Sequence, residues 1–274
     1  MRAAGPDWAF RGVMPRFCAN LSMLYTEHEF LDRFAAAAKD GFKGIEYHFP
    51  YAYPKEQILE KLKGHRQVQV LFNLPPGNWE KGERGLACLP GRAGEFQEGV
   101  GKALDYARAL GCRQINCLAG IVPADAPTDQ VHQTFIDNLK YAAKAAAAEK
   151  VRLLVEPINQ YDMPGFYLCG VGMARWVIDE VGSNNLFIQY DLYHQQRSEG
   201  ELVANFQRHQ DHIKHIQLAD NPGRHEPGTG EINYPYVFTE IDVAGYEGWV
   251  GCEYKPKGKT SDGLGWIREW ARSQ

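Results

Sequence analysis

Eight short runs rich in β-branched and aromatic residues recur along the chain, separated by stretches of helical periodicity. This alternation is the pattern of repeated β-α units that build a parallel sheet. Eight such units are the number in a closed (β/α)8 TIM barrel. The expected strands cover residues 16–21, 44–49, 68–74, 114–119, 151–156, 186–191, 213–219 and 249–254. An open, doubly wound sheet also fits this pattern, because periodicity does not report closure.

Several of the intervening helices have recognisable ends. Thr26 with Glu29 has the spacing of a capping box before an apolar stretch, and Gly41 follows as a stop. Residues 95–110 carry apolar side chains on one helical face and end before Gly111, and residues 128–150 repeat the pattern. The sequence therefore predicts helices between the strands.

The length of 274 residues suits one α/β barrel, which typically takes about 250 residues. No Pro-rich or Ser-rich linker divides the chain. We therefore expect a single barrel domain over residues 15–274. Residues 1–14 have no place in the β-α rhythm, and we expect an N-terminal extension there, either disordered or produced by an upstream start.

Composition excludes several classes of function. The formal net charge is −4, so the chain offers no broad attraction for nucleic acid or anionic lipid, and no basic cluster stands out along the sequence. No window reaches the roughly 18 apolar residues of a membrane span, and the first 15 residues lack the apolar core of a secretion signal. The six cysteines form no C-x-x-C pair. These features predict a cytoplasmic protein with reduced, mostly buried thiols.

Polar residues end the last four predicted strands. In a TIM barrel the reactive groups stand at the carboxyl ends of the strands, so these residues should converge there. Three carboxylates and an amide at one end would repel unless a cation lay among them, and oxygen ligands suit Mg²⁺ or Mn²⁺ better than zinc. The candidate metal ligands are Glu156, Asp191, Gln217 and Glu253. Any one of them could instead cap a helix or pair with Lys or Arg.

Two of these carboxylates also suit a proton-transfer reaction. On opposite sides of a hydroxy-carbonyl compound, Glu156 and Glu253 could remove a proton from one carbon and return it to the next. A bound metal would polarise the carbonyl and stabilise the enediolate. We therefore predict these two residues to be the catalytic pair.

Further polar residues lie in loops that should surround the same end of the barrel. His194, His225 and Lys255 follow strands six, seven and eight, and Glu46 ends strand two. The glycine-rich loop after strand three carries Arg84 and has the composition of a lid. These five are the candidate substrate-binding residues, although Arg84 could equally lie in a solvated loop. His209, His212 and His215 resemble a histidine metal site in spacing, but the helix-to-strand transition between them argues against one.

Long strings across the chain resemble the hydroxypyruvate isomerase family, within the xylose-isomerase-like TIM barrels. They include RFCANLSML at 16–24, GERG at 82–85, LPGR at 89–92, EPIN at 156–159, QYDLYH at 189–194, EPGTGEINY at 226–234 and GCEYKP at 251–256. The resemblance runs from about residue 15 to 270. It implies the barrel fold, the acid pair Glu156 and Glu253, and interconversion of hydroxypyruvate with 2-hydroxy-3-oxopropanoate (tartronate semialdehyde).

The resemblance also bears on cofactors and partners. The wider group holds a divalent ion through Glu, Asp, His and Glu, and Gln217 stands where the epimerases have histidine. It implies a homo-oligomer, and no nucleotide cofactor is expected because no Gly-rich dinucleotide or P-loop motif is present.

Other functions remain open at this point. A 2-oxo-tetronate isomerase would use the same acid pair on a larger acid, and a keto-sugar 3-epimerase would need a pocket for an uncharged sugar. An endonuclease on this fold would need a histidine-rich multi-zinc site and a basic groove. A catalytically silent barrel would bind ligand without proton transfer.

Overall fold

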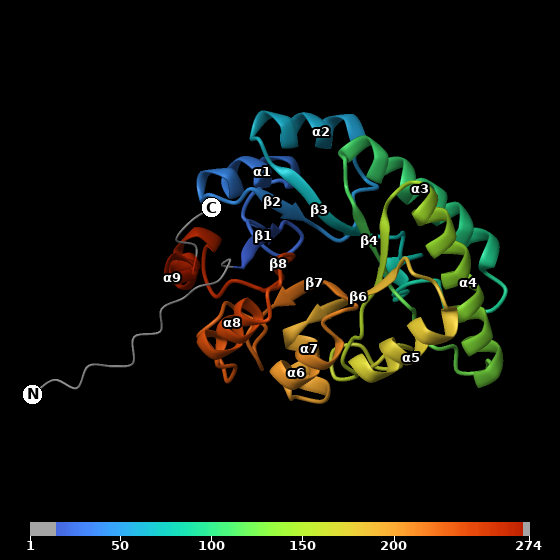
Figure 1. Cartoon of the computed structure of the whole chain (residues 1–274). Helices are drawn as coiled ribbons and strands as arrows, with labels where there is room; N and C mark the ends of the chain where they lie inside the picture. Colours follow the sequence, from blue (N-terminus) through green and yellow to red (C-terminus); the bar gives the residue numbers. More distant parts are fainter. Residues whose placement is uncertain (1–14, 271–274) are drawn as a thin grey trace, which may run out of the picture.

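A closed parallel barrel of eight strands forms the centre of the molecule in the computed structural model, which describes residues 15–270 (Figure 1). The predicted extension 1–14 lies outside the described residues, as do residues 271–274. The strands are β1 Arg16–Asn20, β2 Gly44–Glu46, β3 Val68–Asn73, β4 Gln114–Cys117, β5 Arg152–Val155, β6 Leu186–Asp191, β7 Ile213–Leu218 and β8 Trp249–Cys252. The closed barrel confirms the predicted fold and removes the doubly wound alternative.

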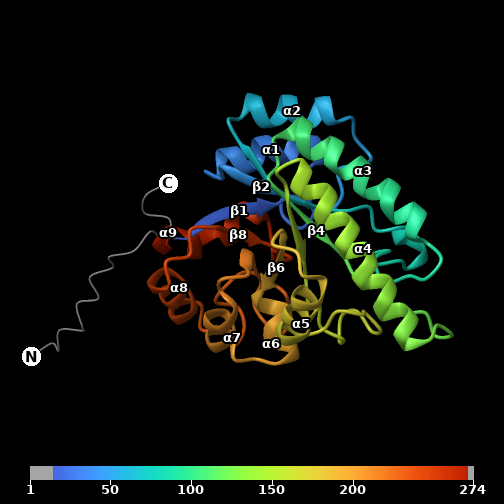
Figure 2. The same cartoon turned by 45° about the vertical axis from the view of Figure 1, so that its right-hand side comes forward.

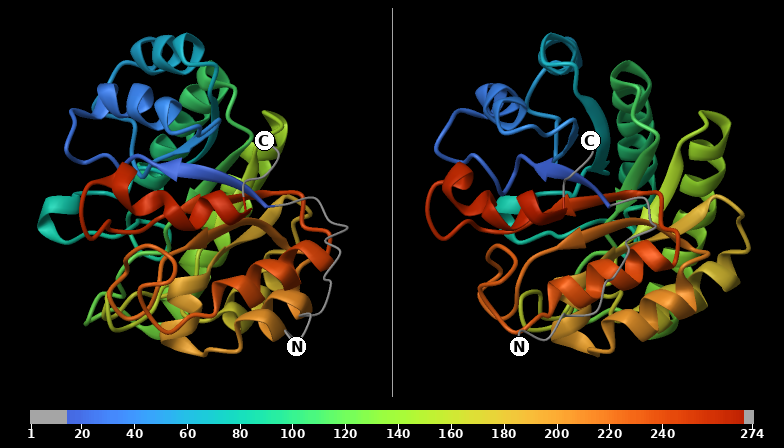
Figure 3. Two further views of the ribbon diagram at one scale, coloured as in Figure 1. Left: turned by 90° about the vertical axis from the view of Figure 1, so that its left-hand side faces the viewer. Right: turned by 60° about the vertical axis from the view of Figure 1, so that its left-hand side comes forward.

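Closure depends on pairing between the first and last strands. Arg16 to Ala19 of β1 pair in parallel with Trp249 to Cys252 of β8. In Figure 3 the blue first strand lies directly beside the red last strand. All eight strands run in the same direction, so their carboxyl ends surround one end of the barrel, called the mouth below.

Helices cover the outside of the barrel (Figures 1 and 2). They are α1 Phe30–Lys39, α2 Lys55–Gly64, α3 Ala93–Leu110, α4 Thr128–Ala148, α5 Val171–Val181, α6 Leu192–Ser198, α7 Leu202–His209, α8 Tyr234–Val243 and α9 Ile267–Trp270, with 3-10 turns η1 Trp79–Lys81 and η2 Thr260–Trp266. None of the helices in this part of the chain is long and apolar enough to cross a membrane.

The apolar faces predicted for two helices pack onto the sheet. Phe96, Val100 and Ala103 of α3 are buried, as are Phe135 and Leu139 of α4. Each fully buried side chain of this size contributes about 1.5–3 kcal/mol of hydrophobic free energy. Periodicity therefore placed these helices and their buried faces correctly.

The capping box predicted before α1 is absent. The helix begins at Phe30, its N-cap is Glu29, and no side chain caps it. Thr26 lies in a turn instead. The spacing of a capping box is a local pattern, and here the chain leaves β1 through a turn that delays the helix.

Candidate active site

Three buried carboxylates lie at the mouth, at or just after the ends of β5, β6 and β8. Glu156, Asp191 and Glu253 are each at most 5% exposed. Their charges interact, and within residues 15–270 Arg224 is the arginine that pairs with Asp191 and Glu253. The predicted convergence of these acids is therefore present in the structure.

Asp191 uses its two oxygens differently. Oδ1 accepts hydrogen bonds from the backbone N–H groups of Tyr193 (2.7 Å) and His194 (3.2 Å), and so caps helix α6. Oδ2 is buried and has no hydrogen-bond partner; His194 Nε2 and Arg224 Nη2 each lie 3.9 Å from it. Burial raises the pKa of Asp191 to about 7, although Arg224 opposes the shift. A buried acceptor without a partner is the feature that a cation would satisfy.

Glu156 and Glu253 have opposite environments. Burial, followed by the charges of Glu253 and Asp191, raises the pKa of Glu156 well above its usual range, although Asn116 donates to its Oε2 at 2.9 Å. Burial would also raise the pKa of Glu253, but a hydrogen bond from His48 and the charge of Arg224 outweigh it and hold this pKa at about 2. The environment of Glu156 therefore favours its protonated form, and the environment of Glu253 favours its ionised form.

The contacts of Glu253 explain its ionised state. His48 Nε2 lies 2.5 Å from Oε1, and Arg224 Nη2 lies 3.1 Å from Oε2. Asn20 Nδ2 donates to Oε1 at 3.4 Å. Hydrogen bonds and positive charge directed at a carboxylate favour its charged form.

His194 is neutral and its tautomer is set by a neighbour. Burial, with the nearby charge of Arg224, lowers the pKa of this imidazole to about 3. Asn159 Nδ2 lies 2.7 Å from His194 Nδ1, while Asn159 Oδ1 accepts from the backbone N–H of Asp162. Because an amide nitrogen can only donate, Nδ1 accepts and Nε2 carries the hydrogen. That N–H is directed at the mouth, 4.0 Å from Glu156 Oε1.

Arg224 was not among the predicted metal ligands or substrate residues, although its neighbour His225 was. The residue has a left-handed backbone, with φ +54°, and its guanidinium lies over the ring of Tyr193. Asp220 organises this loop by accepting backbone hydrogen bonds from residues that include Gly228, Gly230 and Ile232. A long-range loop fold of this kind leaves no periodic signal in the sequence.

Of the four predicted metal ligands, Glu156 and Asp191 belong to a group of described side chains that could hold a metal ion, and the third member of that group is His194, which was predicted to bind substrate; Gln217 and Glu253 are not part of it. Carboxylate oxygens of Glu156 and Asp191 and a nitrogen of His194 lie within 4.8 Å of one another. With one arginine among three carboxylates, full ionisation leaves negative charge that a divalent cation would compensate, and the unpartnered Asp191 Oδ2 offers an open position. The residues therefore suit a hard divalent ion.

Gln217 occupies the strand next to Asp191, as the β6–β7 register pairs these two residues. Its Nε2 donates to Glu46 at 2.7 Å, and its Oε1 accepts from Gln189 at 2.5 Å. The amide oxygen keeps one lone pair, so a ligand role for Gln217 stays a prediction.

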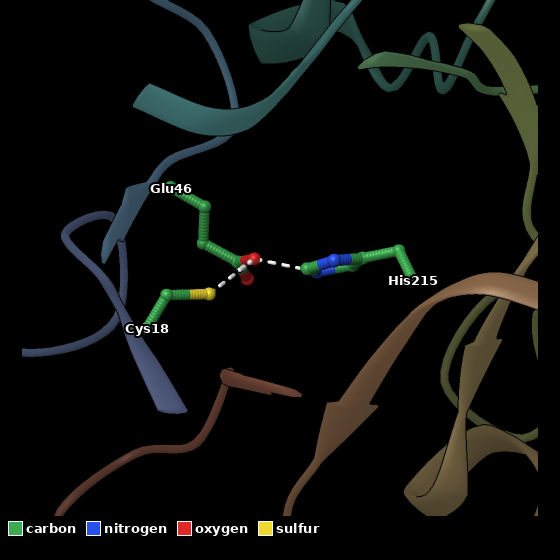
Figure 4. Close-up of side chains that lie close together, drawn as sticks. All are labelled: Cys18, Glu46 and His215. Carbon is green, nitrogen blue, oxygen red and sulfur yellow. Dashed lines mark hydrogen bonds and ion pairs between the residues drawn. The ribbon is translucent and has the colours of Figure 1, made fainter. Parts of the chain in front are cut away.

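Glu46 lies beneath the mouth and has no exposed surface. Figure 4 shows its carboxylate between Cys18 and His215, whose side chains point toward it. Both oxygens accept hydrogen bonds, so this placement does not favour the substrate contact predicted for Glu46. His215 pairs with Glu46 and His212 with Asp211, and none of the grouped metal-ligating side chains among the described residues combines His209, His212 and His215, in agreement with the rejection of a histidine triad.

The remaining predicted substrate residues lie around the rim. His225 Nδ1 lies 2.7 Å from the carbonyl oxygen of Lys255, so the loops after β7 and β8 are joined there. Lys255 is exposed. Arg84 lies over the ring of Trp79 and donates to the carbonyl of the same residue at 2.9 Å.

Trp79 connects the Arg84 loop to the mouth. Its ring contacts that of Phe49, which in turn contacts His48, the partner of Glu253. Arg84 is therefore connected to the catalytic candidate Glu253 through successive ring contacts.

A cavity of about 700 Å³ opens at the opposite end of the barrel and contains none of the predicted site residues. Arg16, Arg113, Arg152 and Lys214 contribute to its lining. The sequence analysis found no basic cluster because these residues come from four different strands or their preceding loops. The carboxylates of the mouth, rather than this cavity, hold the groups that acid–base chemistry needs.

The cysteines agree with the expected reduced state. All six are free; five are buried and Cys169 is partly exposed.

Comparison with known proteins supports an isomerase. The chain is 53% identical to the hydroxypyruvate isomerase of Escherichia coli K12, over 93% of this chain and 98% of that protein. It is 49% identical to the 2-oxo-tetronate isomerase of Cupriavidus necator, over 94% of this chain and 99% of that protein. These relatives confirm the prediction of an isomerase enzyme.

Solved structures share the fold. A crystal structure described as an AP endonuclease of family 2 from Brucella melitensis superposes with a TM-score of 0.92 at 44% identity, over 94% of this chain and 99% of that one. A 3-keto-D-glucoside 4-epimerase from E. coli has a TM-score of 0.75 at 19% identity, over 94% and 100% of the two chains, which shows the fold alone. Residues 34–270 match the model of the xylose isomerase-like TIM barrels. With eight strands closed around a carboxylate-lined mouth, the chain belongs to the xylose isomerase-like TIM-barrel family.

Proposed function

We propose that this enzyme interconverts hydroxypyruvate and 2-hydroxy-3-oxopropanoate through an enediolate, with Glu156 and Glu253 as the acid–base pair. The observation that supports the proposal is that two buried carboxylates in the same mouth have contrasting contacts: Glu156 accepts from the neutral Asn116, whereas Glu253 contacts His48 and Arg224, so that their pKa values shift in opposite directions. Two carboxyl groups whose environments drive their pKa values apart are suited to act as acid and base.

The contrast assigns a direction to the proton transfers. Ionised Glu253 removes a proton from C3 of hydroxypyruvate, the C2–C3 double bond of the enediolate forms, and protonated Glu156 delivers a proton to C2. The hydroxyl proton on O3 passes to O2, so that C3 becomes the aldehyde and C2 carries the new hydroxyl. The substrate's atoms and charge balance without a hydride acceptor, and proton exchange with solvent returns Glu253 to its ionised form and Glu156 to its protonated form.

Neutral His194 is placed to assist the charge that develops on oxygen. Its Nε2–H points into the mouth, and a neutral imidazole can donate to an enediolate oxygen without first losing a proton. Arg224 supplies positive charge beside Glu253 and is the first candidate to bind the substrate carboxylate. Arg84, His225 and Lys255 provide further cationic or donor groups around the rim.

Glu156, Asp191, Gln217 and Glu253 would hold Mg²⁺ or Mn²⁺. When bound, such an ion polarises the carbonyl and stabilises negative charge on the enediolate oxygens. The buried, unpartnered Asp191 Oδ2 is the observation that supports a cation there.

The test is an NMR assay with hydroxypyruvate in D₂O, with and without Mg²⁺ or Mn²⁺. We expect formation of 2-hydroxy-3-oxopropanoate with deuterium entering at C2 and C3. Glu156→Gln should lower turnover by about 10²- to 10⁴-fold, the usual contribution of a positioned acid or base, with folding preserved. Glu149→Gln, a surface carboxylate paired with Arg108, is the matched control and should leave turnover unchanged.

The four-carbon 2-oxo-tetronate is the second candidate substrate, because relatives of 40–49% identity carry that name. The proton transfers would be the same, and the ratio of kcat/KM for the two acids decides between them. Conversion of neither acid, with no solvent exchange at any metal concentration, would refute the isomerase proposal. Conversion of a keto-sugar instead would favour an epimerase.

A further inference from the structure

The carboxylate of Glu46 is the most extensively hydrogen-bonded group beneath the mouth. Oε1 accepts from Asn20 Nδ2 at 3.0 Å and from Gln217 Nε2 at 2.7 Å. Oε2 accepts from Cys18 Sγ at 3.3 Å and lies 2.6 Å from His215 Nε2 (Figure 4). Burying a carboxylate costs several kcal/mol unless donors surround it, so a group with four donors is strongly held in place.

His215 donates to Glu46 through Nε2. Gln114 Nε2 lies 3.2 Å from His215 Nδ1, and an amide nitrogen only donates. His215 Nδ1 therefore accepts, and Nε2 carries the hydrogen that is donated to Glu46. Although Cys18, Glu46 and His215 could be mistaken for a metal site, these hydrogen bonds already occupy the atoms that would bind a metal.

One line of contacts leads from Glu46 to the catalytic candidate Glu253. Asn20 Nδ2 lies between them, 3.0 Å from Glu46 Oε1 and 3.4 Å from Glu253 Oε1. Asn20 Oδ1 accepts from the backbone N–H of Ser22, so the amide has a fixed orientation. Glu46 therefore holds the amide that contacts the general base.

A second line leads to Gln217. Because Gln217 Nε2 donates to Glu46, the amide oxygen must point elsewhere. Replacing the carboxylate with a group that can donate would allow the Gln217 amide to turn over, and its NH₂ group cannot bind a metal ion. Glu46, together with Gln189, which donates to Gln217 Oε1, thus sets the orientation of the Gln217 amide, whose oxygen keeps one lone pair for a ligand.

The neighbouring strand leaves room for this carboxylate. A Cβ atom at Gly251 would come within 2.3 Å of Glu46 Oε1, so glycine is needed there for Glu46 to keep its position.

We infer that Glu46 is a positioning residue, which holds Glu253 through Asn20 and orients the Gln217 amide for metal binding. The inference rests on the proposed function, in which Glu253 is the base and Gln217 a ligand. Groups that orient metal ligands typically change metal affinity by 10- to 100-fold when they are removed.

The test compares Glu46→Gln with Cys18→Ala. Glu46→Gln preserves shape but introduces an NH₂ group among the donors, whereas Cys18→Ala removes one donor to the same carboxylate and leaves both lines to the mouth intact. The dissociation constant for Mn²⁺ is measured by calorimetry without substrate, and kcat and KM are measured with hydroxypyruvate and 2-oxo-tetronate.

For Glu46→Gln we expect about 10- to 100-fold weaker Mn²⁺ binding and a similar fall in kcat, with KM changed much less. Cys18→Ala should stay within about twofold of the wild type in all three quantities. If Glu46→Gln also stays within twofold, or if Cys18→Ala causes equal losses, the carboxylate has only a structural role and the inference is wrong.

Two further arms keep the result interpretable. If Glu46→Gln does not fold, Asn20→Ala interrupts the line to Glu253 alone and should lower kcat by at least about tenfold while Mn²⁺ affinity changes less. An unchanged kcat would overturn the inference. If the wild type converts neither acid, the proposed function fails, but the Mn²⁺ titrations of wild type and Glu46→Gln still decide whether Glu46 orients the ligands.

Discussion

Replacing Arg224 with methionine should destabilise the protein, because it removes a guanidinium that lies among three buried carboxylates. Its Nη2 lies 3.1 Å from Glu253 Oε2, and at an effective dielectric constant of about 20 the attraction is about 5 kcal/mol. Glu253 keeps the hydrogen bonds from His48 and Asn20 and can take up a proton, which limits the loss. We therefore expect the free energy of unfolding at pH 7 to fall by about 2–4 kcal/mol.

The pH dependence separates this cause from a packing defect. The pKa of Glu253 is lowered to about 2 in the folded state, so its contribution is present above the unfolded pKa, near 4, and is lost as pH falls toward 2. The difference between wild type and Arg224→Met should therefore shrink on acidification below about pH 4.

Urea unfolding at pH 7, 4 and 3 measures this difference, and Arg175→Met is the control. Arg175 pairs with Asp179 on the surface of α5, where such a pair contributes less than about 1 kcal/mol. A loss for Arg224→Met no greater than for the control, or a loss that persists unchanged at pH 3, would refute the electrostatic reasoning.

Three other predictions follow from the described contacts. Asn159→Asp should make Nδ1 of His194 the hydrogen-bearing nitrogen, and ¹⁵N NMR of the imidazole ring would detect this change of tautomer. The same variant should lower kcat more than it changes KM. An unchanged tautomer would contradict the assignment. Mg²⁺ binding should strengthen as pH rises through about 7 and should release protons, because burial raises the pKa of Asp191 to about 7 and also raises that of Glu156. Calorimetry in buffers of different ionisation enthalpy measures the proton release, and equal heats in all buffers would argue against it. Gly85→Ala should lower the free energy of unfolding, measured with urea, by about 1–3 kcal/mol. The reason is that φ at Gly85 is +118° and a Cβ atom there would lie 2.2 Å from a backbone oxygen. The loss should exceed that of the control Gly82→Ala, where a Cβ atom would meet open space.

The barrel and the acidic residues at its mouth could be predicted because both depend on local patterns in the sequence. The eight strands follow from β-rich runs, and the acids of the mouth follow from the position of Glu156 and Glu253 immediately after β5 and β8. Helix α4 shows the same principle, since its apolar spacing alone identifies its buried face.

Contacts that depend on barrel closure could not be predicted in the same way. Glu46 and His215 are 169 residues apart in the sequence, and they meet because closure of the barrel leaves only β8 and β1 between β7 and β2. Arg224 reaches the mouth through a loop whose backbone is held by Asp220, and no periodicity records such a fold. The alternative that an acid at a strand end caps a helix was also partly right, because Asp191 caps α6.

The two oxygens of Asp191 separate architecture from chemistry within one side chain. Oδ1 keeps α6 in place whether or not the mouth is occupied, so the protein has no need to refold when it gains or loses a ligand at Oδ2. Asparagine at this position could retain the helix cap while losing the charge, whereas alanine would lose both. Asp191→Asn should therefore yield a folded protein without the proposed activity, in which the fold can be studied separately from the chemistry.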